Sequence, residues 1–204
     1  MSALLLGLVI FFGVHSVSIV NDAWRNRMVE KMGEWPWKGL YALVSVAGFV
    51  LIIWGYGLAR QDSVVLYTPP AWLHPVAMVL LIPVFPLLLA AYLPGRIQTA
   101  AKHPMLAATK LWAIAHLLAN GMLADVLLFG VFLVWAVLDR ISMKHRMQRP
   151  VPSVPPSRAN DLIAVVGGLA LYAAFVLWLH GWLIGVPLID GFEWEAGQAW
   201  VVLV

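Results

Sequence analysis

Long runs of apolar residues, separated by short polar segments, dominate this chain. Six of the runs approach the roughly 20 residues that a helix needs to cross the hydrocarbon core of a bilayer. They cover Ala3–Val20, Trp37–Ala59, Trp72–Leu93, Pro104–Asn120, Met122–Leu138 and Leu162–Val186. The pattern therefore predicts an all-α fold, a polytopic integral membrane bundle of about six transmembrane helices.

Helix-breaking residues refine this prediction. Pro83 and Pro86 fall inside the third run and should kink it. Pro104 opens the fourth run, which is typical of a first helical position. Gly121 alone separates the fourth and fifth runs, so we expect a tight helical hairpin there. The proline-rich polar stretch Arg149–Asn160 is the clearest candidate for a linker.

Composition and charge support membrane insertion. The 204 residues are 62% hydrophobic and 11% charged, whereas a soluble domain carries roughly 25% charged residues. A soluble enzyme is therefore excluded, and the absence of cysteine excludes disulfides and thiolate chemistry. We expect one transmembrane domain over residues 1–190, followed by a short acidic and aromatic tail over 191–204.

The basic residues predict the orientation. Eleven of the thirteen Lys and Arg residues fall in alternate loops, and Arg60 alone falls on the opposite side. The eleven are Arg25, Arg27, Lys31, Lys38, Arg96, Lys102, Arg140, Lys144, Arg146, Arg149 and Arg158. The positive-inside rule then places both termini outside the cytoplasm, in a bacterial inner membrane. The same bias explains the net charge of +3 without a nucleic-acid partner.

Histidines within the apolar runs are the first candidates for chemistry, because ionisable groups are costly at membrane depth. His15 shares a helical face with Phe11 and Phe12, and His116 shares one with small residues. Two imidazoles on facing helices can ligate haem iron. Their predicted depths differ by roughly 14 Å at about 1.5 Å per residue, so His180 is an alternative partner for His116. Helix packing through hydrogen bonds is the other interpretation of these rings.

Polar groups near the fourth run extend this hypothesis. Lys102, His103 and Lys110 could bind haem propionates near a helix N-terminus, although a simple helix start and a snorkelling lysine also explain them. Trp112 and Asn120 lie on the same predicted face as His116 and could support it. Asp125 is expected to be an exposed helix cap, with a proton relay as the alternative.

Two segments give the chain a family resemblance. Lys102–Gly121 (KHPMLAATKLWAIAHLLANG) and Phe11–Ser16 (FFGVHS) resemble motifs of the NnrU family of bacterial membrane proteins, and the overall plan is similar over Met1–Pro187. The resemblance implies a link to denitrification and its nitrite and nitric oxide reductases. It also implies a relationship to zeta-carotene isomerase, a membrane enzyme with haem b, whose ligands correspond by motif to His15 and His116.

One departure limits what this resemblance implies. Ala113 stands where the isomerase has a cysteine that takes part in a ligand switch, so isomerisation by that route is not expected here. An HP turn also resembles membrane methyltransferases that use S-adenosylmethionine, but their C-terminal Glu-Glu motif is missing.

The main expectation is thus a haem b-binding integral membrane protein in contact with membrane lipid. It would sense redox state or nitric oxide and support denitrification membrane proteins. A cis–trans isomerase of a carotenoid-like polyene and a non-catalytic assembly partner are the alternatives.

Overall fold

The computed structural model describes residues 1–147, 149 and 151–189, and within them the fold is all-α. Val65 and Met122 form an isolated antiparallel bridge in place of a sheet. The predicted tail over 191–204 lies outside the described residues. The chain forms two compact units, each from two chain segments. Unit 1 comprises Met1–Pro69 with Asn120–Gln148, and unit 2 comprises Pro70–Ala119 with Arg149–Val204.

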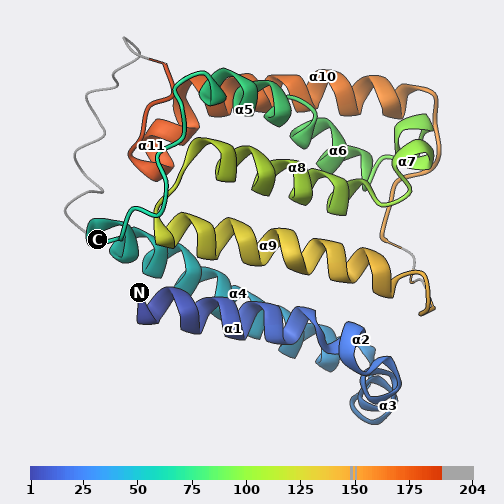
Figure 1. The fold of residues 1–204 in the computed structure, drawn as a ribbon. Helices are drawn as coiled ribbons and strands as arrows, with labels where there is room; N and C mark the ends of the chain where they lie inside the picture. The colour runs from blue at the N-terminus through green and yellow to red at the C-terminus, as the bar shows by residue number, and fades with distance from the viewer. Residues whose placement is uncertain (148, 150, 190–204) are drawn as a thin grey trace. The chain divides into compact units, whose positions relative to one another are not determined.

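Unit 1 is built on the close packing of α1 (Ser2–His15) against α4 (Glu34–Gln61) (Figure 1). Three glycines permit this approach. A Cβ added to Gly55 would lie 2.3 Å from the backbone nitrogen of Leu4, and one added to Gly48 would lie 2.7 Å from that of Phe11. Gly7 faces the α4 backbone in the same way. Small residues at a helix interface are the usual means of close packing in a membrane.

The first apolar run ends earlier than predicted. Asn21 caps the next helix by accepting a hydrogen bond from the Trp24 backbone N–H at 2.9 Å, which is a typical N-cap role. Within the predicted run, α1 ends at His15 and the short α2 (Val17–Val20) covers the remainder, and the polar α3 (Asp22–Met32) follows the Asn21 cap. The long α9 (Leu123–Ser142) completes unit 1 by packing against α1 and α4.

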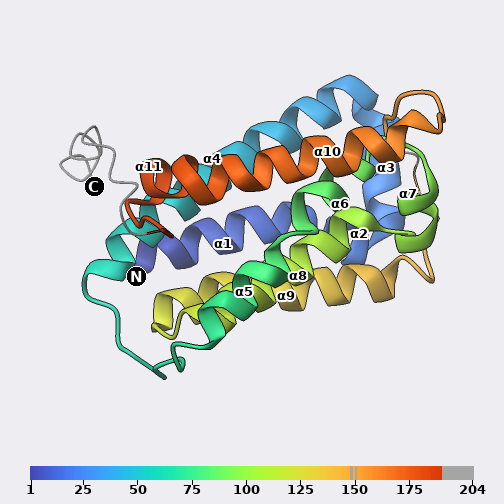
Figure 2. The same cartoon turned by 90° about the horizontal axis from the view of Figure 1, so that it is seen from above.

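Unit 2 contains α8 (Pro104–Ala119), which packs against α5 (Leu73–Leu81) and α6 (Val84–Ala90) (Figure 2). The predicted kink at Pro83 is confirmed, because α5 ends before it and α6 begins after it. At this break the N–H of Ile82 bonds to Val79, and the Tyr172 hydroxyl donates instead to the free Met78 carbonyl at 2.9 Å. The start of α8 at Pro104 is confirmed as well.

The remaining helices of unit 2 lie on either side of the predicted linker. They are α7 (Arg96–Ala101), α10 (Ala159–Ala174), a π-helical segment η1 (Phe175–Leu179) and α11 (His180–Ile184). Asp161 accepts hydrogen bonds from the backbone of Arg96 and Ile97 at 2.9 and 3.0 Å, and Asn160 donates to the Pro94 carbonyl. The stretch predicted as a linker is therefore fastened to the turn before α7.

The prediction of six membrane spans is only partly supported. Among the described residues, three stretches are long and apolar enough to cross a membrane: Glu34–Gln61, Leu73–Ala90 and Ala159–Ile184. The helices α1 and α8 are apolar but have 14 and 16 residues. The helix α9 has 20 residues, but Asp125, Asp139 and Arg140 lie within it.

Candidate functional site

His15 is the last residue of α1 and is held by its own helix. Its Nδ1 lies 2.7 Å from the carbonyl oxygen of Phe11, one turn earlier. Because a carbonyl oxygen only accepts, the ring proton is on Nδ1, and Nε2 carries the lone pair. The Phe11 ring stacks on the imidazole at a centroid distance of 4.1 Å, and Tyr41 and Trp135 lie at 5.2 and 5.9 Å. The aromatic wall predicted around His15 is thus present, with rings from three helices.

A charged pair that the sequence analysis missed lies near this wall. Asp139 is 6% exposed and forms a salt bridge with Arg146 at 2.5 Å. Its carboxylate is close enough to act electrostatically on both His15 and Tyr41. The predicted fifth span ends at Leu138, four residues before the end of α9, so it leaves Asp139 outside. Its signal would have been an ionisable residue inside an apolar helix.

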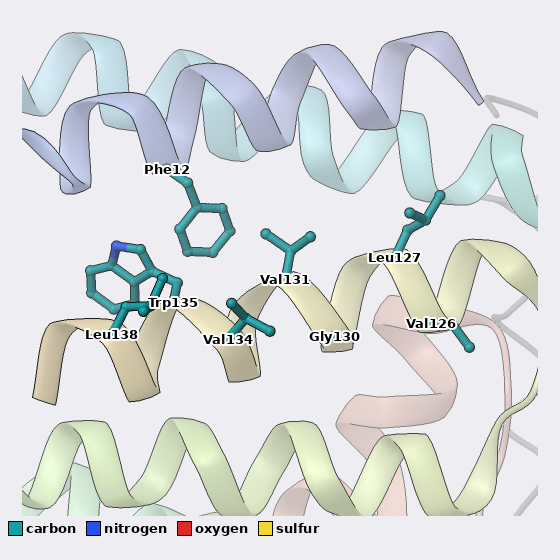
Figure 3. Close-up of a pocket in the computed structure, with 8 residues that line it drawn as sticks. All are labelled: Phe12, Val126, Leu127, Gly130, Val131, Val134, Trp135 and Leu138. Carbon is teal, nitrogen blue, oxygen red and sulfur yellow. The ribbon is translucent and has the colours of Figure 1, made fainter. Parts of the chain in front are cut away.

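An apolar groove of about 370 Å³ runs along α9 beside the same wall (Figure 3). Phe12 reaches over it from α1, and the remaining lining residues belong to α9: Val126, Leu127, Gly130, Val131, Val134, Trp135 and Leu138. The indole nitrogen of Trp135 is on the side of its ring nearer α1. Within the described part of the chain, this buried nitrogen has no hydrogen-bond partner. Trp135 therefore borders both the groove and the His15 ring.

His116 lies near the end of α8 in unit 2, and its ring is anchored in the same way as that of His15. Its Nδ1 is 2.9 Å from the carbonyl oxygen of Trp112, one turn earlier. The Trp112 ring lies 5.2 Å away, so the predicted neighbour of His116 does contact it. Ala113 and Ala115 on the same helix are fully buried.

The other predicted binding residues lie along α8 and just beyond its two ends. Lys102 and His103 form the turn before α8, where Lys102 has a φ of +60°. Thirteen residues, about 20 Å of helix, separate His103 from His116. Lys110 lies between them, half-buried. Asn120 follows α8 and belongs to unit 1, where its carbonyl accepts a hydrogen bond from the Tyr67 hydroxyl at 2.8 Å.

His180 begins α11, directly after the π-helical segment, and its Nδ1 lies 2.7 Å from the carbonyl oxygen of Val186. The C-terminal end of α8 and the helix α11 lie at the same end of unit 2 (Figures 1 and 2). His180 and His116 are therefore in one unit, whereas His15 is in the other.

Asp125 is a helix cap, as predicted, but the prediction that it is exposed is wrong. It is 1% exposed and accepts hydrogen bonds from the Tyr56 hydroxyl at 2.6 Å and from the Met122 backbone N–H at 3.1 Å. Burial and the Asp125 carboxylate raise the pKa of the nearby Tyr67 hydroxyl above its usual range. Met122, which donates to this carboxylate, is also bridged to Val65.

The described residues contain no group of three His, Cys, Asp or Glu side chains that could hold a metal ion by themselves. In the comparisons with known proteins, the family model described as NnrU protein matches residues 3–188 of the 204. No curated protein and no solved structure matches the chain.

Proposed function

Because the chain belongs to the NnrU family, we propose that it is a haem b-binding membrane protein that supports denitrification. It would act on the expression or function of nitrite and nitric oxide reductases by sensing redox state or nitric oxide. His15 and His116 are the candidate axial ligands.

The shared anchoring of the two imidazoles is the observation that carries this proposal. Both rings use Nδ1 for a carbonyl one turn earlier, and metal-ligating histidines commonly orient themselves through such a bond from the second nitrogen. Nε2 is then the atom available for iron. A porphyrin supplies four nitrogens of its own, so two axial residues suffice and no cluster of three protein ligands is required.

The residues around each ring fit this role. Phe11 stacks on His15 and also provides the carbonyl that fixes its rotation. Trp112 provides the corresponding carbonyl for His116, and its ring lies beside the imidazole at a tilt. Because the hydrogen bond at Nδ1 fixes the rotation of each imidazole, its Nε2 has a defined direction in which to ligate iron. When bound, haem would supply ferrous iron, which binds nitric oxide.

The proposal includes six membrane crossings with both termini outside the cytoplasm, in a bacterial inner membrane, supported by the alternation of basic loops. In this topology α1 and α8 run in opposite directions, and each histidine lies near the C-terminal end of its helix. The predicted depths of the two imidazoles therefore differ, by roughly 14 Å at about 1.5 Å per residue. His180, in the same unit as His116, is the alternative second ligand.

An absorption spectrum of the full chain, purified in detergent after expression with ample haem, tests the proposal. We expect a Soret band that His116→Ala removes or shifts and that His145→Ala, a change at an exposed loop histidine, leaves intact. His15→Ala and His180→Ala then identify the second ligand. A missing Soret band, or an unaltered spectrum in His116→Ala, would contradict haem ligation. Normal denitrification without either ligand would favour an assembly partner whose histidines only pack.

The groove along α9 favours a second candidate function, a cis–trans isomerase of a long polyene. Its lining is apolar and aromatic, and Trp135 connects it to His15. A Cβ on Gly130 would meet no atom within 4 Å, so Gly130→Leu should fill the groove without disturbing α9. Expression beside a carotene pathway should change the isomer ratio for wild type and not for Gly130→Leu. Equal ratios with and without the wild-type chain would exclude this activity.

A further inference from the structure

The polar helix α3 lies across the direction of the apolar helices α1 and α4. Figure 1 shows α3 end-on and Figure 2 shows it lengthwise, while α1 and α4 extend along both views. Asn21 caps its beginning, and Gly33, with a φ of +85°, ends it directly before α4. A polar helix that crosses the axes of membrane-spanning helices lies along the membrane surface.

Tryptophans attach α3 to the first turns of α4. The Trp24 and Trp37 rings pack edge to face at 6.1 Å, and the Arg25 guanidinium lies 5.9 Å from the centre of the Trp37 ring. Trp24 remains 41% exposed and the neighbouring Trp35 79% exposed. Tryptophan is enriched where hydrocarbon meets headgroups, so these rings place α3 at headgroup depth.

Two cations of α3 share a face with Trp24. Helical spacing brings Trp24, Arg27, Met28 and Lys31 to one side of the helix. Arg27 and Lys31 are exposed, and neither forms an ion pair within the described part of the chain. By contrast, Lys38 on the adjoining turn of α4 is already paired with Glu34 at 2.7 Å.

We propose that Arg27 and Lys31 bind the phosphate headgroup of an anionic phospholipid. Two unpaired cations one turn apart can each donate a charge-assisted hydrogen bond to the non-ester oxygens of one phosphate diester. Trp24 and Met28, on the same face, contact the upper acyl chain below it. This lipid site depends on membrane insertion and is independent of haem.

Native mass spectrometry of the full chain in detergent, titrated with phosphatidylglycerol or phosphatidylcholine, tests the site. Arg27→Gln with Lys31→Gln is the test variant. Arg140→Gln with Lys144→Gln is the matched control. It removes an Arg and a Lys with the same four-residue spacing, at the end of α9. A cation near an anionic surface contributes about fivefold to lipid affinity. We therefore expect roughly 25-fold weaker phosphatidylglycerol retention in the test variant and little change in the control.

Four further outcomes decide the proposal. Exchange of the two cations, Arg27→Lys with Lys31→Arg, should retain the lipid, and inorganic phosphate at equal concentration should not compete for the site. Equal losses in the test and control variants would mean that only net charge attracts the lipid, which overturns the site. Equal retention of phosphatidylcholine and phosphatidylglycerol by the wild-type chain would overturn it as well.

Discussion

Replacement of Asp125 by alanine removes the carboxylate that accepts two hydrogen bonds at the start of α9. The carboxylate joins α4 to the start of α9, because it accepts from the Tyr56 hydroxyl and from the Met122 backbone N–H. Alanine leaves the Tyr56 hydroxyl without its partner and the first turn of α9 without its cap. We therefore expect a large loss of stability from a single side chain.

The magnitude follows from these two lost interactions. A lost N-cap costs about 1 kcal/mol, and a buried hydroxyl without a partner costs about 1–3 kcal/mol. The free energy of unfolding should fall by about 2–4 kcal/mol in total. For a chain of this length, each kcal/mol lowers the unfolding temperature by about 2–4 °C, so we expect a decrease of roughly 5–15 °C.

Thermal unfolding of the purified chain in detergent measures this effect. Asp125→Asn retains an acceptor oxygen and should lose less, while Asp62→Ala, an exposed carboxylate at the end of α4, should change stability by less than about 0.5 kcal/mol. Tyr56→Phe combined with Asp125→Ala should be less damaging than the sum of the single changes, because both remove one hydrogen bond. An Asp125→Ala variant as stable as Asp62→Ala, or additive single effects, would refute this reasoning.

Three further predictions concern other parts of the two units. Gly55→Ala should lower the unfolding temperature because its Cβ would meet the α1 backbone, whereas Gly39→Ala on the same helix has open space and should be neutral or slightly stabilising. The pKa of Tyr67 is raised by burial and by Asp125. The neutral Tyr67 hydroxyl therefore stabilises the fold below the unfolded-state pKa of about 10, and this contribution is lost as pH rises above it. The difference in unfolding temperature between wild type and Tyr67→Phe should shrink above pH 10. Asp161→Ala should speed hydrogen exchange of the Arg96 and Ile97 amides, which now donate to that carboxylate, and unchanged exchange would show that α7 does not depend on this cap.

Local sequence rules predicted the features that depend on neighbouring residues. The break at Pro83 follows from its missing N–H and fixed φ, and the start of α8 at Pro104 from the same ring at a position where no N–H is needed. The capping role of Asp125 also follows from its place in the first turn of an apolar run. Each of these predictions requires only residues within one helical turn, and each is confirmed.

Contacts between distant segments account for what the sequence analysis missed. Asp125 accepts from the N–H of Met122, which is itself bridged to Val65, and nothing in the local sequence marks that pairing. Asp139 lies within α9 and is paired with Arg146, seven residues later and beyond the end of the helix. The supposed linker is fastened through Asn160 and Asp161, whose partners precede them by more than 60 residues.

The histidines show most clearly which features the sequence predicts and which only the structure reveals. Apolar periodicity selects His15 and His116 as ionisable groups inside apolar helices, but it cannot say which ring nitrogen is available. That depends on the rotation of each ring, which the carbonyl one turn earlier determines. The same bond that would satisfy a packing histidine also directs Nε2 away from its own helix. Packing and ligation therefore share one geometry, and the distinction between them rests on what Nε2 meets, which the spectra of the single variants measure directly.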